Sequence, residues 1–109
     1  PVDLATGSFV SLDHATAGTA RILLLADGRR FVRLEGFETE NGPDLYVWLL
    51  PIGGYEGGTP DDYLDLGTLT GTIGGQNYEL PAEFEPGVHR TVLICCRRFG
   101  VPFAAAPLG

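Results

Sequence analysis

Glycine and proline interrupt this chain too often for long helices. The sequence holds 16 Gly and 8 Pro in 109 residues, about a fifth of the chain. Both residues break helices and favour tight turns. The runs between them are apolar or alternating and only about four to eight residues long, which is typical of strands. Because turn signals recur about every ten residues, we predict an all-β fold, an antiparallel sandwich or small barrel of short strands.

Two runs are apolar on nearly every residue, residues 45–50 (LYVWLL) and residues 91–96 (TVLICC). A strand of this kind is covered on both faces, so we place both centrally in a sheet. Shorter strands are expected on either side of them in the sequence. They are predicted at residues 7–10, 19–26, 30–34, 66–69, 77–80 and 101–106.

The clearest hairpin turns at Asp27-Gly28, because both residues tolerate a positive φ. The strand that returns from it, residues 30–34, alternates and places Val32 and Leu34 on one face.

The second half of the chain contains one long irregular segment, residues 52–63, which is rich in Gly and acids. A single helical turn is expected at residues 60–64. The closing segment, residues 101–106, is apolar but contains Pro102 and is followed by Pro107. Proline cannot donate to a ladder, so we expect an edge strand there.

Charge and length exclude several classes of function. Seven basic residues, all Arg, stand against 14 acidic ones, which gives a net charge of −7. Such a surface repels nucleic acid and anionic lipid. No apolar run approaches the roughly 20 residues of a membrane-spanning helix. We expect residues 1–109 to form one domain. Because the chain begins at Pro1 without a leader, we also expect an upstream signal peptide or lipid-anchor linker.

The only sulfur atoms belong to Cys95 and Cys96, since the chain has no Met. Adjacent residues of a strand point to opposite faces, so these thiols can join only through a strained vicinal disulfide. We therefore predict that they are not bonded to each other. Alternation places Cys96 on one face with Val92 and Ile94, and Cys95 on the other face with Leu93.

Several segments, taken in order, resemble the DM-thirteen domain family, whose members are often labelled electron-transfer domains. The likeness covers essentially the whole chain. The segments that carry it are Gly7-Ser8-Phe9, His14, Gly18-Thr19-Ala20, Phe37, Asn41-Gly42-Pro43-Asp44-Leu45-Tyr46-Val47-Trp48-Leu49, Leu66-Gly67-Thr68-Leu69-Thr70-Gly71, Gly74-Gly75-Gln76-Asn77-Tyr78-Glu79-Leu80-Pro81, Val92-Leu93-Ile94-Cys95-Cys96-Arg97-Arg98-Phe99, Val101, Phe103, Ala106 and Leu108.

The resemblance implies a β-rich extracytoplasmic domain, secreted or anchored at the cell surface, that exchanges electrons with a redox partner protein. It also implies one characteristic cysteine, which maps to Cys96 and acts as a redox thiol or as a ligand to a prosthetic group such as haem. Members of the family commonly carry Trp or another large residue at the preceding position, where this chain has Cys95. That second thiol adds the option of a disulfide within or between molecules.

Each thiol also has a structural interpretation. Unpaired Cys is among the most buried residue types, so Cys96 is either a packed hydrophobe or a functional thiol. A functional thiol needs access and a lowered pKa, which Arg97 or Arg98 could provide. We expect Cys95, on the less apolar face, to be the exposed thiol, with a secondary role.

A metal site is a weaker hypothesis. His14 and His89, the only imidazoles, would form a His₂Cys copper set with Cys96, but no spacing links them, and exposed loop positions are favoured. Haem has no C-x-x-C-H motif here. Haem and copper thus remain alternatives for the cofactor, and no motif supports either one. We expect Asp44 to hydrogen-bond the local backbone, and the acidic residues 61, 62 and 65 to be solvated.

No Ser-His-Asp group, phosphate-binding Gly loop or carboxylate pair is visible, which favours a domain that is not an enzyme. Two hypotheses remain in front. The first is an extracytoplasmic redox module that uses Cys96. The alternative is a cell-surface structural or interaction domain in which Cys96 is buried and inert. A metal carrier is a third, weaker option.

Overall fold

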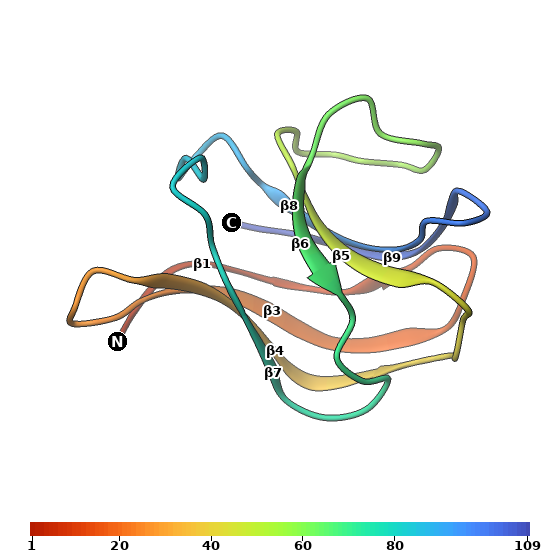
Figure 1. The fold of residues 1–109 in the computed structure, drawn as a ribbon, viewed down its shortest axis with the longest axis horizontal. Coiled ribbons are helices and arrows are strands. Elements are labelled where there is room, and N and C mark those ends of the chain that lie inside the picture. The colour runs from red at the N-terminus through yellow and green to blue at the C-terminus, as the bar shows by residue number, and fades with distance from the viewer.

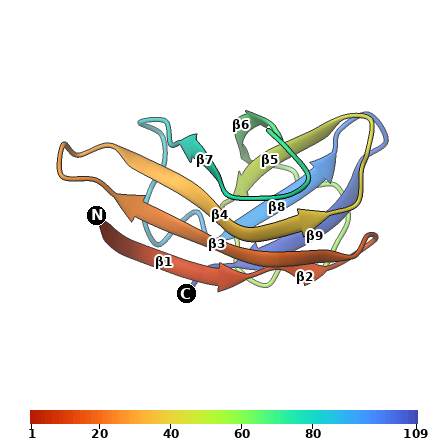
Figure 2. The same cartoon turned by 90° about the horizontal axis from the view of Figure 1, so that it is seen from below.

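The computed structural model describes all 109 residues, which form nine strands and no helix (Figure 1). The strands build two antiparallel sheets, one in the order β1-β3-β4-β7 and the other in the order β2-β9-β8-β5-β6. One layer lies over the other (Figure 2), so the predicted all-β sandwich is confirmed. The strands are β1 (Val2–Ser8), β2 (Val10–Ser11), β3 (Thr16–Leu24), β4 (Arg30–Thr39), β5 (Leu45–Leu50), β6 (Leu64–Thr68), β7 (Gln76–Glu79), β8 (Thr91–Cys96) and β9 (Val101–Pro107).

The two apolar strands lie where the sequence predicts. β5 and β8 begin and end at the predicted residues and pair with each other inside the five-stranded sheet. The Asp27-Gly28 hairpin is also present, with Gly28 at a φ of 91° and the N–H of Arg29 donating to the Asp27 carboxylate at 3.0 Å. Val32 and Leu34 are fully buried, as their alternation indicates.

The first predicted strand is divided between the two sheets. β1 belongs to the four-stranded sheet and β2 to the five-stranded one, and the chain crosses between them at Phe9. The Phe9 ring turns into the core and meets Phe37 edge to face, with 5.4 Å between centroids. A strand predicted to run without interruption through residue 9 is therefore wrong, because burial of Phe9 requires the chain to change layers there.

The prediction of an edge position for the last strand is also wrong. β9 lies inside its sheet, between β8 and β2. β2 pairs with it only at Ala104 and Ala105, between the two prolines. At Pro102 the register shifts, and the proline carbonyl accepts the N–H of Asp13 at 3.2 Å. On the side of β9 that faces β2, Asp13 is the donor and Pro102 the acceptor. The N–H that proline lacks is therefore not needed for a hydrogen bond on that side.

Strand boundaries elsewhere differ by a few residues. β3 starts and ends earlier than expected, and β4 continues five residues past position 34. β6 starts two residues early and β7 one residue early. Residues 60–64 form no helical turn, because the chain there bends and then enters β6. Since the fold has no helices, it has none that could cross a membrane.

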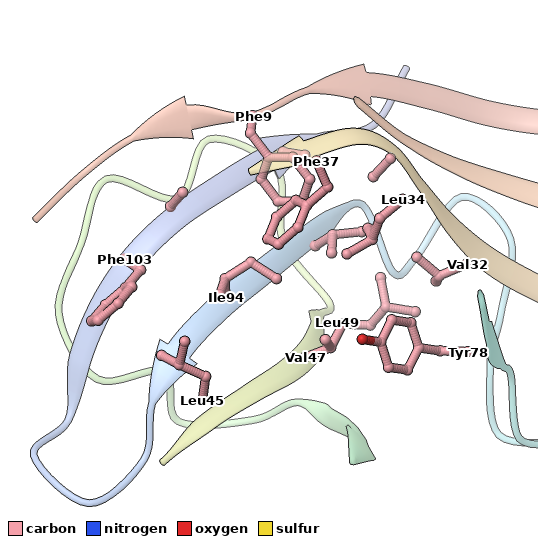
Figure 3. Close-up of a cluster of buried hydrophobic side chains, with 14 of the residues drawn as sticks. Phe9, Val32, Leu34, Phe37, Leu45, Val47, Leu49, Tyr78, Ile94 and Phe103 are labelled. Carbon is pink, nitrogen blue, oxygen red and sulfur yellow. The ribbon is translucent and has the colours of Figure 1, made fainter. Parts of the chain in front are cut away.

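Two apolar layers sit on the two faces of the five-stranded sheet. The inner layer is the sandwich core of 18 buried side chains, and Figure 3 shows Leu34 and Phe37 facing Val47 and Ile94 across it. The outer layer, called here the outer cluster, consists of five buried side chains. Because both faces of this sheet are covered, its central strands are apolar on consecutive residues. The members of the outer cluster are Trp48, Leu50, Leu93, Cys95 and Ala105.

Candidate functional site

The two thiols occupy the last two positions of β8, where the strand gives way to the exposed turn at residues 97–100. Both cysteines are free, as predicted. Both are also buried, with Cys95 2% and Cys96 1% exposed. The expectation that Cys95 is the exposed thiol is therefore wrong, because the outer face of this sheet is itself covered by side chains.

Cys96 faces the sandwich core. It pairs with Leu45 of β5 and with Val101 of β9, and it belongs to the same core cluster as Phe103. The end of the core is tightly closed at this point, since a Cβ added to Gly42 would lie 2.8 Å from the Phe103 ring. Cys96 lines none of the cavities in the structure. A reagent can reach this sulfur only when the end of the sandwich opens.

Cys95 faces the opposite way, into the outer cluster. The cover of this cluster comes from Leu12, from Tyr46 of β5, and from residues 51–63, the segment between β5 and β6, called here the cover loop. Tyr55 of the loop packs on the cluster, and the Tyr63 ring stacks on Trp48 with centroids 3.9 Å apart and planes at 14°. The Tyr55 hydroxyl donates to the Gly58 carbonyl inside the loop. Access to Cys95 thus depends in part on this loop, beside Tyr46, which pairs with Cys95 across the sheet.

The outer cluster contains one polar group without a partner. The indole N–H of Trp48 is buried and makes no hydrogen bond. A buried donor of this kind costs about 1–3 kcal/mol relative to a satisfied one. Opening of the cover loop, whose Tyr63 stacks on Trp48, would let water reach this donor.

Burial controls the chemistry of the outer thiol. Loss of solvent raises the pKa of Cys95 to about 11, and the neighbouring Cys96 adds to the rise. Burial likewise raises the pKa of the Tyr55 hydroxyl, with further contributions from Cys95 and Asp13. At neutral pH Cys95 is a protonated thiol, and only the thiolate is nucleophilic. While the cover loop is closed, the Cys95 thiol is consequently protected from reaction at neutral pH.

Arg97 does not serve the role expected of it in this conformation. Its guanidinium lies 4.2 Å from the centroid of the Tyr46 ring and 3.8 Å from the Asp44 carboxylate. The backbone carbonyl of Asp44 accepts the backbone N–H of Arg97 at 2.9 Å. The carboxylate of Asp44 also faces Arg97, rather than the local backbone N–H groups. The prediction of local backbone hydrogen bonds for the Asp44 side chain is wrong. These contacts fasten the turn after β8 to the start of β5.

The two histidines do not join Cys96. Nδ1 of His14 lies 2.9 Å from a Glu40 carboxylate oxygen, and Nδ1 of His89 accepts the backbone N–H of Glu85 at 3.0 Å. No group of three His, Cys, Asp or Glu side chains is placed to hold a metal ion. With no cavity at either sulfur, the residues present do not fit a haem or copper ligated by Cys96, and no step through such a group is derived.

Sequence reasoning missed the outer cluster as the environment of Cys95. The signal was present in the continuous apolarity of β5 and β8, which requires a cover on the outer face. Trp48 and Leu50 mark that face on β5, and both are buried. Part of the cover, however, comes from a Gly-rich loop, whose path no periodicity indicates.

Fold and site together define a small β-sandwich domain with a free thiol on each face of one strand end. The chain belongs to the family described as Electron transfer DM13, which matches residues 8–108. The resemblance drawn from the sequence is thereby confirmed. No curated protein and no solved structure matches the chain.

Proposed function

We propose that this domain is an extracytoplasmic electron-transfer module whose redox groups are the paired thiols of Cys95 and Cys96. The observation that carries the proposal is that consecutive residues at the end of β8 hold two free thiols, one on each face of the sheet. Family membership supports electron transfer in general. An oxidising compartment outside the cytoplasm would supply disulfide partners for such thiols.

The chemistry is an exchange with a partner protein's disulfide. After the cover loop opens, Cys95 loses its proton, and its thiolate attacks one partner sulfur. A bond forms between Cys95 and that sulfur while the partner's other sulfur leaves as a thiolate. Cys96 then loses its proton and attacks the Cys95 sulfur, which releases the second partner thiolate. Two thiols are oxidised to one disulfide, the partner disulfide is reduced to two thiols, and two electrons have moved.

The position of the thiols suits a carrier rather than a permanent bridge. Their side chains lie on opposite faces of β8, so a bond between them distorts the strand end. A strained disulfide is more easily reduced, and its couple has a more oxidising potential. The oxidised form would therefore accept two electrons readily from a partner's dithiol, by the reverse of the exchange above. The reduced form, with both thiols packed, is the stable one.

The proposal is tested by equilibrating the native protein with mixtures of reduced and oxidised glutathione and measuring intact mass after acid quench. We expect a form lighter by two protons to appear only under oxidising mixtures and to be absent from Cys95→Ser and Cys96→Ser. A native protein whose mass never changes, under mixtures that oxidise the unfolded chain, would contradict the proposal.

A cell-surface structural or interaction domain is the second candidate, and one observation favours it. Both cysteines are at most 2% exposed and pack among apolar side chains, as inert cysteines do. In this alternative, thiol reagents label Cys95 and Cys96 only at the rate of global unfolding. Faster labelling of Cys95 than of Cys96 in the folded protein would instead support the redox module.

A further inference from the structure

A partly open cavity of about 340 Å³ lies at the end of the sandwich away from the thiols. It lies between β1, β3, residues 108–109 and the connection from β7 to β8, and we name it the Phe84 pocket. β8 begins beside this pocket and ends at Cys96, so about 17–20 Å of extended chain separates the two sites. In Figure 1 this connection lies on the left, and the turn after β8 lies on the right. The pocket is therefore independent of the redox chemistry.

The walls of the Phe84 pocket are apolar where they are deepest. Ile22 of β3 is 1% exposed and Phe84 is 4% exposed, while Leu4, Ala5 and Leu108 complete the apolar lining. Small-molecule sites are typically cavities of about 300–1,000 Å³ with mainly apolar walls. A cavity of about 150 Å³ accepts a single benzene ring. The Phe84 pocket thus has room for about two fused rings or a branched chain of similar size.

One polar group at the rim is oriented by the backbone. Nδ1 of His89 accepts the N–H of Glu85, so the neutral ring carries its proton on Nε2. Nε2 has no partner in the protein, and His89 lines the pocket. The imidazole is therefore held as a hydrogen-bond donor for an acceptor oxygen of a ligand.

The rim also gathers unpaired positive charge in an acidic protein. Four of the seven arginines form ion pairs with carboxylates, and Arg30, Arg90 and Arg98 do not. The Arg30 guanidinium lies 5.0 Å from the centroid of the Phe84 ring, and Arg90 lines the pocket. Arg90 thus lines the cavity and Arg30 lies against the Phe84 ring that forms part of its wall, although the chain has a net charge of −7. Glu83 and Glu85 flank Phe84 in sequence, but neither side chain lines the pocket.

We propose that the Phe84 pocket binds a small organic carboxylate whose apolar body has the size of one or two rings. The body would contact Ile22 and Phe84, and the carboxylate would lie at the rim. There it would accept from His89 and neutralise Arg30 and Arg90, whose guanidinium groups no carboxylate holds in place. Neither thiol takes part, so this site goes beyond the proposed redox function.

The test uses 2-naphthoate as the probe, with 2-naphthamide as its uncharged isostere, and follows the backbone amide signals of the native domain by NMR. We expect saturable shifts confined to residues 84–90, β1 and β3, with a Kd of about 0.1–1 mM, as suits a ligand of this size. The amide should bind about 3- to 10-fold more weakly, since it lacks the charge.

Two pairs of variants decide the assignment. Ala5→Leu fills the pocket and should weaken naphthoate binding at least about tenfold, whereas Ala17→Leu, the same change at an exposed position of β3, should not. The double variant Arg30→Gln and Arg90→Gln should abolish the preference for the carboxylate. Arg97→Gln with Arg98→Gln, which removes the same charge at the other end, should preserve it. Absence of saturable shifts, or binding that survives Ala5→Leu, would overturn the proposal.

Discussion

Tyr63 stacks on Trp48 with ring centroids 3.9 Å apart, and this contact fastens the end of the cover loop to the outer face of the five-stranded sheet. Tyr63 is 37% exposed and Trp48 only 4%, so the Tyr63 ring lies at the surface and covers a buried member of the cluster that contains Cys95. The rest of the loop is held by few side chains, and Glu56, Asp61 and Asp62 form no ion pair. The stack is thus, with the packing of Tyr55, one of the two contacts by which the loop covers the layer of the outer thiol.

Removing the stack should expose Cys95. Offset aromatic pairs contribute about 0.5–1.5 kcal/mol beyond buried area, so Tyr63→Ala should raise the rate of Cys95 alkylation about 2- to 10-fold. The rate is measured with iodoacetamide in a Cys96→Ser background, so that only one thiol reports. Phe99→Ala, which removes an exposed ring from the turn after β8, is the control and should leave the rate unchanged. Equal rates in both variants would show that the loop does not control access.

The raised pKa of Cys95 should make stability fall at high pH. Burial raises the pKa of this thiol from 9.0 to about 11 in the folded protein. A group with a raised folded pKa contributes stability that is complete below its unfolded pKa and is lost as pH rises through the folded one. The native protein should therefore lose free energy of unfolding between about pH 9 and 11 relative to Cys95→Ala.

Urea unfolding at pH 7, 9 and 10.5 measures this difference. The raised pKa of Tyr55 acts in the same range, but Tyr55 is present in both proteins and cancels in the comparison. A constant difference between the two proteins across this range would mean that Cys95 titrates normally and is solvated.

The central strands were predictable because their continuous apolarity indicates that both of their faces are covered. Val92, Ile94 and Cys96 alternate with Leu93 and Cys95, and the structure places the two sets in the inner and outer layers as that alternation requires. The alternation of side chains between the two faces of a strand depends only on neighbouring residues, so it can be read from one sequence. The same holds for the Asp27-Gly28 hairpin.

Features that depend on distant contacts were not predictable. The change of sheet at Phe9 follows from its packing on Phe37, 28 positions away, and the interior place of β9 follows from its pairing with the distant strand β2. The burial of Cys95 depends on where a Gly-rich loop folds back. No local pattern encodes these contacts, because each exists only after the two sheets have met.

The interior of the sandwich should tolerate loss of the Cys96 sulfur better than its replacement by a hydroxyl. Cys96→Ala leaves a small void and should cost about 1 kcal/mol. Cys96→Ser nearly preserves volume but buries a hydroxyl among apolar side chains, which should cost about 1–3 kcal/mol. The expected order of stability is native, then Ala, then Ser, measured by chemical unfolding at pH 7. A serine variant as stable as the native protein would mean that its hydroxyl finds a partner there.

The crossing between the two sheets should depend on Gly7. A Cβ added there would lie 1.9 Å from the carbonyl oxygen of Pro107, which belongs to the backbone of β9 and cannot rotate away. Gly7→Ala should therefore force β1 away from β9 and lower the free energy of unfolding by about 2–4 kcal/mol. Gly71→Ala is the matched control, because its nearest neighbour would be 3.8 Å away and its φ is not positive. It should leave stability unchanged or raise it by up to about 1 kcal/mol. Thermal and urea unfolding of both variants measure the effect, and a Gly7→Ala protein as stable as Gly71→Ala would show that the sheets do not approach each other this closely at the crossing.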